Sequence, residues 1–148
     1  MIVKEVITRE DRPDGYNFAA CSDGSDKSMQ CLDLMCQMRQ DKDRIEVIIC
    51  EQENLDSYFV KQKVSDYLEE KNCLDKTHIH ILKSEPGKKA KDLIREHITE
   101  KCGLYTDFVF IGNTGADFSG HKSKYLGSVA NEILCHTKVN TVFISHKR

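Results

Sequence analysis

Hydrophobic and polar positions follow two patterns that take turns along this chain. Five short runs are rich in apolar, β-branched or aromatic residues, which is typical of buried strands. These runs cover 16–21, 45–50, 78–82, 108–111 and 141–145. Between them, apolar residues recur every three or four positions, the spacing of one face of an α-helix. The chain is therefore expected to alternate between strands and helices.

Four helices are expected between these strands. Ser25 or Asp26 can cap the first, and its apolar stripe contains Cys31, Met35 and Met38. The others are expected over about 56–71, from 86–87 to a stop at 103, and around 129–134. Strict alternation predicts an α/β protein with a single doubly wound, five-stranded parallel sheet and helices on both faces. Right-handed crossovers leave a few topologies, of which we expect the order 3-2-1-4-5.

The first fifteen residues stand apart from this pattern. Ile2, Val3, Val6 and Ile7 are apolar, so residues 1–15 are expected to form an N-terminal arm or an extra edge strand. The segment 9–15 is charged, with a proline and a glycine, and is expected to be an exposed loop. Residues 16–148 show no linker or repeat, and they are expected to form one domain.

Composition and charge remove several classes of function. The chain has 148 residues and a formal net charge of −2, so no general attraction draws it to nucleic acid or to an anionic membrane. It contains no apolar run of the roughly 18 residues that a membrane span needs, and its first residues mix charged and apolar side chains, so no secretory signal is expected there. Its seven cysteines include no CxxC pair and are expected to be reduced, mostly buried thiols. These features predict a cytoplasmic protein.

Two polar loops follow predicted strands at positions where an α/β sheet binds ligands. One covers 21–28, after the first strand, and the other begins at 112, after the fourth. In the order 3-2-1-4-5, the carboxyl ends of the first and fourth strands meet where the strand order reverses, and ligands bind in the crevice at that point. We therefore expect the two loops to face each other.

The second loop has the chemistry of a phosphate site. Gly112 and Gly115 lack Cβ atoms, so their backbone amides can approach an anion closely. Gly127 and Ser128 open the next helix, whose free amides and positive end favour a phosphate. Thr114 offers another hydroxyl. Turn formation alone would also account for these glycines, but their position after an apolar strand favours phosphate.

Several stretches resemble the universal stress protein family, in its ATP-binding type. They are Ile111-Gly-Asn-Thr-Gly-Ala, the run from Tyr125-Leu-Gly-Ser to Cys-His136, and Val139-Asn-Thr-Val-Phe-Ile. ATP-binding members of that family carry Gly-x₂-Gly-x₉-Gly-Ser/Thr, and their first strand leads into an Asp-x-Ser loop, here Asp23-Gly-Ser25. The resemblance extends over about 16–146. It implies an adenine nucleotide α-hydrolase-like fold.

The resemblance also implies a site for ATP, AMP or ADP, with or without Mg²⁺. Its base and ribose side would comprise Cys21, Ser22, Asp23 and Gln52. Its phosphate side would comprise Ile111, Gly112, Thr114, Gly115, Gly127, Ser128 and Val129. Two features depart from the family pattern. Eleven residues separate Gly115 from Gly127, where the family has nine, and Gln52 stands where an apolar residue is common.

The function predicted from these features is nucleotide binding by a regulatory protein of the stress response. No general base or metal-binding carboxylate is evident beside the phosphate loop, so at most slow ATP hydrolysis is expected. One alternative is a homodimeric interaction module without nucleotide, paired through the last strand. A weaker one is a PP-loop-type ATP pyrophosphatase, because residues 22–28 faintly resemble that loop.

No metal site is expected from the sequence. His78 and His80 alternate along one strand and would share a face, but no third ligand is evident near them. A partly exposed edge strand explains the pair more simply.

Overall fold

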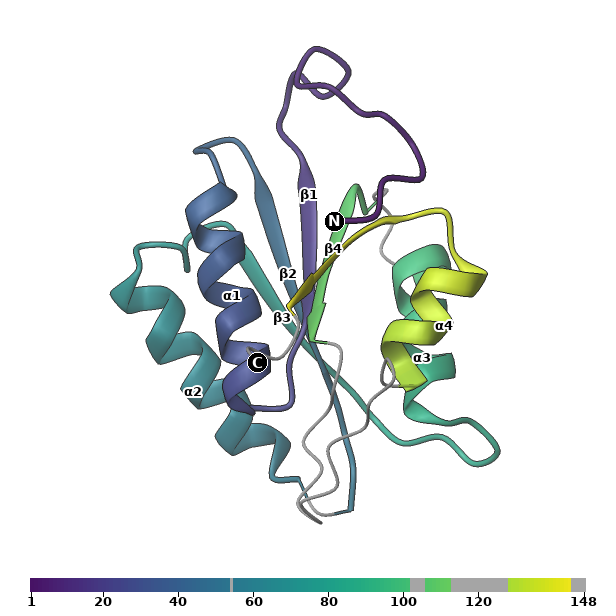
Figure 1. The fold of residues 1–148 in the computed structure, drawn as a ribbon. Coiled ribbons are helices and arrows are strands. Elements are labelled where there is room, and N and C mark those ends of the chain that lie inside the picture. The colour runs from purple at the N-terminus through teal and green to yellow at the C-terminus, as the bar shows by residue number, and fades with distance from the viewer. Residues whose placement is uncertain (54, 102–105, 113–127, 145–148) are drawn as a thin grey trace.

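The computed structural model describes residues 1–53, 55–101, 106–112 and 128–144. Within these residues strands and helices alternate along the chain (Figure 1). The strands are β1 (Asn17–Cys21), β2 (Arg44–Cys50), β3 (Thr77–Leu82), β4 (Phe108–Gly112) and β5 (Asn140–Ile144). The helices are α1 (Asp26–Met38), α2 (Ser57–Glu70), α3 (Ala90–Glu96) with the π-helical turn η1 (His97–Lys101), and α4 (Ser128–His136).

The five strands form one parallel sheet in the order β3-β2-β1-β4-β5, which confirms the predicted fold class and strand order. β1 is central: it pairs with β2 on one side and with β4 on the other. Helices α1 and α2 cover one face of the sheet, and α3 and α4 cover the other (Figure 1).

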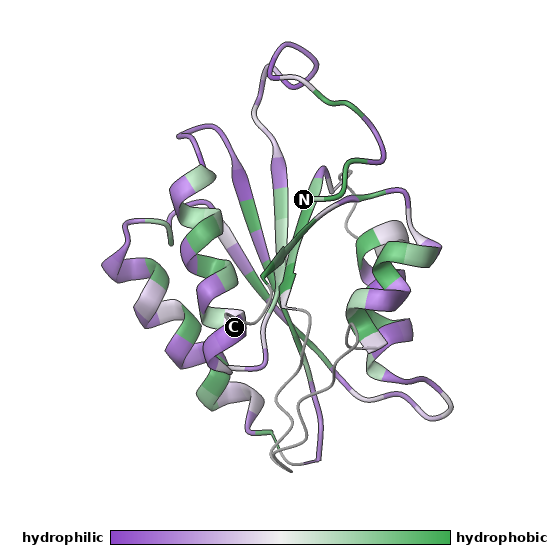
Figure 2. Cartoon of the chain, viewed as in Figure 1, coloured by the Kyte–Doolittle hydropathy of each residue, from purple (hydrophilic) through white to green (hydrophobic). Residues whose placement is uncertain are grey.

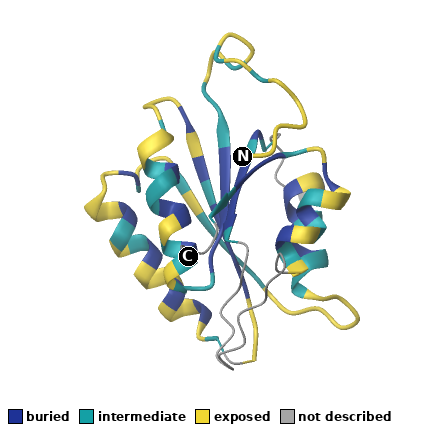
Figure 3. Ribbon diagram, in the orientation of Figure 1, coloured by how far each residue is buried: buried dark blue, intermediate teal, exposed yellow. Residues whose placement is uncertain are grey.

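Each face of the sheet carries its own apolar core, because successive residues of a strand point to opposite faces. Under α1 and α2 lie the side chains Phe18, Ala20, Ile45, Val47, Ile49, Leu32, Met35, Val64 and Leu68. Under α3 and α4 lie Ala19, Cys21, Ile48, Cys50, Val109, Ile111, Leu93, Ile94 and Ile133. The inner strands β1, β2 and β4 are accordingly mostly buried, whereas the edge strand β3 is only partly buried, and each helix turns a polar face outward (Figures 2 and 3). Burying one Leu or Ile side chain contributes about 1.5–3 kcal/mol.

The helix starts and buried faces follow the local sequence. Ser25 is the N-cap of α1, and Asp56 is the N-cap of α2, its carboxylate accepting from the amides of Tyr58 and Phe59. The predicted stripe of α1 needs one correction: Met38 ends the helix and is 39% exposed, whereas Leu32, which the pattern did not include, is fully buried. α3 begins later than predicted, at Ala90, because Gly87 has a positive φ of 78°.

The N-terminal segment runs along the amino-terminal side of the sheet and reaches β5. Ile2 and Thr141 exchange two backbone hydrogen bonds of 2.8 and 3.0 Å in an isolated antiparallel bridge. Asn140 fixes the next residues, its side-chain oxygen accepting from the amides of Lys4 and Glu5. Among the described helices, none has both the length and the apolar character needed to span a bilayer. The six described cysteines are free thiols.

Candidate functional site

The carboxyl ends of β1 and β4 lie side by side where the strand order reverses. Ala20 pairs with Phe110, so Cys21 and Ile111 follow one position further along neighbouring strands. This edge is the lower end of the sheet in Figure 1. From it the chain passes from β1 into α1 on one face of the sheet, while α3 and α4 cover the opposite face. The topology thus places Cys21, Ser22 and Asp23 beside Ile111 and Gly112, at a topological switch point.

The loop after β1 is held in shape by its own hydroxyl and carboxylate groups. Ser22 is buried; its amide donates to Ile48 across the sheet, at 3.0 Å, and its hydroxyl lies 3.1 Å from that of Ser28. The Oδ1 atom of Asp23 accepts from the amide of Ser25 at 2.9 Å, an Asx turn. The carboxylate of Asp23 is therefore oriented at the sheet edge by the same turn that starts α1.

Helix α2 supports this loop at Gly24. Gly24 has a φ of 80°, and a Cβ there would lie 3.2 Å from a methyl group of Val60. The ammonium of Lys63 donates to the carbonyl of Gly24 at 2.8 Å. Glycine is thus required at this position both by its backbone conformation and by the close packing of α2.

The β1 end of the site is apolar beneath its polar loop. Cys21 is 9% exposed, and burial, with smaller contributions from neighbouring groups, raises the pKa of its thiol to about 12. The thiol is therefore neutral at physiological pH. It is an apolar, polarisable group and not a nucleophile.

The β4 side of the site is partly described. Ile111 is buried in the core under α3 and α4, and Gly112 ends β4, paired with Ile144. Ser128 is the first residue of α4 and is exposed, while Val129 packs against the same core. The predicted phosphate residues Thr114, Gly115 and Gly127, and the lengthened loop between the two glycines, lie outside the described residues.

Gln52 lies two residues beyond β2, at the same edge of the sheet. It is exposed, and its carbonyl accepts from the amide of Leu55 at 3.1 Å in a tight turn. Its position after the second strand is where the sequence placed it, and its exposure agrees with a polar residue at this point.

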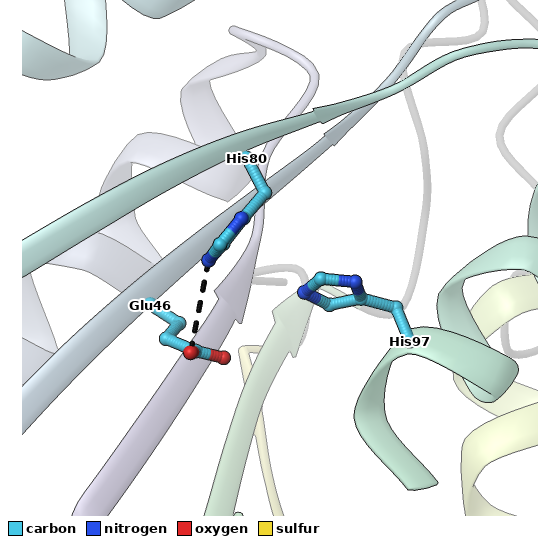
Figure 4. A group of neighbouring side chains, drawn as sticks. All are labelled: Glu46, His80 and His97. Atoms are coloured by element: carbon cyan, nitrogen blue, oxygen red, sulfur yellow. Dashed lines mark ion pairs between the residues drawn. The ribbon is translucent and has the colours of Figure 1, made fainter. Parts of the chain in front are cut away.

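A second group of polar side chains lies on the face of the sheet under α3. This group was not predicted from the sequence. The carboxylate of Glu46 and the imidazoles of His80 and His97 come together there (Figure 4). The sequence offered no third ligand beside His78 and His80, because Glu46 and His97 are far from them along the chain. One signal was present: Glu46 shares a face of β2 with the apolar residues Ile48 and Cys50.

Comparison with known proteins supports the fold. No protein-family model matches the chain, and no curated protein matches it. Among solved structures, a universal stress protein in complex with cAMP is similar over 88% of this chain and 97% of its own, with a TM-score of 0.65 and 18% identity. A hypothetical protein, MJ0577, is similar over 91% and 99%, with a TM-score of 0.69 and 14% identity. A universal stress family protein from Burkholderia pseudomallei is similar over 86% and 94%, with a TM-score of 0.54 and 12% identity. At these identities, what the chain shares with universal stress proteins is their fold.

Proposed function

We propose that this protein binds an adenine nucleotide, ATP, AMP or ADP, at the carboxyl ends of β1 and β4. The observation that carries the proposal is the meeting of the 22–25 loop with Ile111 and Gly112 at the point where the strand order reverses. In parallel α/β sheets this point is where ligands bind, and a glycine there admits a phosphate close to the backbone. A universal stress protein of the same fold has been solved in complex with cAMP, which supports the proposal by analogy.

The proposed contacts divide between the two loops. Cys21 packs against the base, and the carboxylate of Asp23 accepts from a ribose hydroxyl. Gly112, Thr114 and Gly115 approach the phosphates through their amides, and Gly127 and Ser128 add the positive end of α4. Gln52 borders the base, and Ile111 and Val129 close the apolar floor. Binding, and at most slow hydrolysis, is the expected activity.

Calorimetric titration with ATP, AMP and cAMP, each with and without Mg²⁺, tests the proposal directly. Asp23→Asn removes the negative charge and keeps Oδ1, the oxygen that accepts from Ser25, so the loop should hold its shape. We expect at least about tenfold weaker nucleotide binding, the loss of one charge-assisted hydrogen bond. Asp26→Asn, the same charge change in the first turn of α1, is the matched control. Failure of all three nucleotides to bind at millimolar concentration would refute the proposal.

The phosphate side is tested separately at the start of α4. Ser128→Asp places a negative charge where the phosphate would lie, yet an acidic residue at a helix start stabilises the helix. We expect nucleotide affinity to fall while the melting temperature stays constant or rises. Asn131→Asp, the same charge one turn later in α4, should bind nearly as well as the parent. Equal effects of the two changes would exclude α4 from the site.

A second candidate function is a homodimeric interaction module paired through β5. The supporting observation is an exposed apolar group beside that edge, formed by Met1, Ile2, Val3 and Val6. Native mass spectrometry of the purified protein separates the two candidates. A dimer mass with no bound nucleotide favours the module, a retained ATP or AMP mass favours the nucleotide site, and a monomer at micromolar concentration contradicts the module.

A further inference from the structure

The group under α3 contains three side chains from three separate elements. Glu46 comes from β2, His80 from β3 and His97 from the end of α3, and all three point toward one another (Figure 4). One ligand atom from each lies within 4.8 Å of the others. The carboxylate oxygen of Glu46 is 3.7 Å from Nε2 of His80, and the rings of His80 and His97 are 4.7 Å apart between centroids.

The backbone fixes this arrangement. Glu46 is paired with His78, and Ile48 with His80, so Glu46 and His80 lie diagonally on one face of the sheet. Ile48 is fully buried in the core that also contains Leu93, Ile94 and Ile98, and this packing holds α3 against the sheet. His97, one residue before Ile98, is 8% exposed and begins the π-helical turn. Such turns are rare and often mark functional sites.

A hydrogen bond does not account for this group, although Glu46 and His80 are close enough for an ion pair. The 3.7 Å separation between Glu46 and His80 is too long for a hydrogen bond. Nε2 of His80 is buried and has no hydrogen-bond partner among the described residues. A polar atom buried without a partner costs about 1–3 kcal/mol, so a ligand that this nitrogen can bind would remove a penalty.

Two imidazoles and one carboxylate are a recognised donor set for transition metals. Zinc takes His nitrogens and carboxylate oxygens at about 2.0–2.2 Å, and three protein ligands leave its fourth position open. Ligand atoms around such an ion are separated by roughly 3.4 Å, the edge of a tetrahedron with bonds of that length. The separation of 3.7 Å between Glu46 and His80, and the upper limit of 4.8 Å for the other pairs, need only small side-chain rotations to reach that value.

A cavity of about 110 Å³ adjoins the group and shares Glu46 with it. Its lining combines apolar surface, including Phe18, with the polar side chains of Arg44 and His78, and it has room for water. Glu46 therefore lies between the two histidines and a space that a metal-bound water or small ligand can occupy.

We propose that Glu46, His80 and His97 bind one divalent transition metal ion, with zinc the ion that their chemistry fits best. This site is separate from the proposed nucleotide site. Glu46 pairs with Ala19, and the nucleotide loop begins at Ser22, about 10 Å further along β1. Neither site needs the other, so each can be tested alone.

The test uses the full chain, freed of metal by a chelator and titrated with Co²⁺ and Zn²⁺ in calorimetry and absorption spectroscopy. We expect one Co²⁺ per chain, with the visible bands of four- or five-coordinate cobalt, displaced by Zn²⁺. The free cysteines compete for these ions, but a thiolate ligand would add a near-ultraviolet sulfur-to-cobalt band, which should be missing.

Variants locate the site. Glu46→Gln and His80→Gln keep the size of the side chain or nearly so and should each weaken Co²⁺ binding by at least about tenfold. His136→Gln is the matched control, because His136 also lies near a carboxylate, 3.9 Å from Glu132, but on an exposed helix end. Circular dichroism melts check that each variant is folded. No stoichiometric binding, binding with a sulfur band, or binding unchanged in both Glu46→Gln and His80→Gln would each overturn the proposal.

Discussion

Asp43→Asn should destabilise the protein strongly, because this carboxylate ties the N-terminal segment to the sheet. Asp43 is fully buried. It accepts from both terminal nitrogens of Arg9, at 2.5 and 2.9 Å, and from the amides of Tyr16 and Gln40, each at 2.8 Å. Asparagine has one acceptor oxygen in place of two. Whichever way its amide is turned, one backbone amide and one nitrogen of Arg9 lose their acceptor.

These two losses set the size of the effect. A buried backbone amide without an acceptor costs about 1–3 kcal/mol. The bond from Arg9 counts for no more than about 1 kcal/mol, because this side chain is 37% exposed and water can replace its partner. The free energy of unfolding should fall by about 1–4 kcal/mol. With a urea dependence of about 2 kcal/mol/M, the denaturation midpoint followed by circular dichroism should move down by about 0.5–2 M.

Asp75→Asn is the control for this experiment. Asp75 also pairs with an arginine, Arg39, at 3.3 Å, but its side chain is 70% exposed. An exposed pair contributes about 0–1 kcal/mol, so this midpoint should move by less than about 0.5 M. Equal midpoint shifts in the two variants would show that the loss of unfolding free energy does not depend on the burial of Asp43, and would refute the reasoning.

Three further predictions follow from the same structure. Burial would raise the pKa of Asp43, but the hydrogen bonds from Arg9, Gln40 and Tyr16 outweigh burial and hold the pKa below its ordinary value of 3.8. The contribution of the ionised carboxylate to the free energy of unfolding is present above about pH 4 and is lost as the pH falls through the pKa of the folded state. The urea midpoints of the wild type and Asp43→Asn should therefore converge in acid. Gly15→Ala should lower the melting temperature by several degrees, because φ is 97° and a Cβ would lie 2.3 Å from the carbonyl of Lys42, whereas Gly87→Ala, with a similar φ but open space, should cost less. Burial raises the pKa of the Cys31 thiol to about 12, whereas Cys135 is exposed. At pH 8 an alkylating reagent should therefore modify Cys135 quickly and Cys31 only in urea, as measured by mass spectrometry of peptides. Equal rates at the two cysteines in the native protein would contradict this.

The fold could be predicted from the sequence because each element carries a local signal. The run 108–111 is apolar at every position, which fits a strand buried on both faces, and β4 is such a strand in the structure. Val60, Val64 and Leu68 have helical spacing, and all three lie on the buried face of α2. Alternation of the two patterns then leaves few topologies, since parallel strands require right-handed crossovers. The observed order β3-β2-β1-β4-β5 is one of these few.

The side-chain groups could not be predicted in the same way, because they depend on register between distant strands. That Glu46 lies beside His80 requires the pairing of Ile48 with His80, and no local pattern fixes that register. The meeting of Arg9 with Asp43 likewise depends on a turn at Gly15 and on the path of a segment without regular structure. Sequence periodicity identifies the face of a residue, but not its neighbours on that face.

Position along the central strand separates the three polar groups of this protein. At the start of β1, the amides of Tyr16 and Asn17 donate to the buried carboxylates of Asp43 and Asp107. At its middle, Ala19 lies beside Glu46 of the proposed metal site, and beyond its end Ser22 and Asp23 begin the proposed nucleotide loop. Steps of two or three residues are about 7–10 Å, and substitutions at such distances without shared partners act nearly additively. Loss of metal binding in Glu46→Gln should therefore leave nucleotide affinity unchanged, and a coupling of more than about tenfold between the two ligands would mean that the sheet transmits a change along β1.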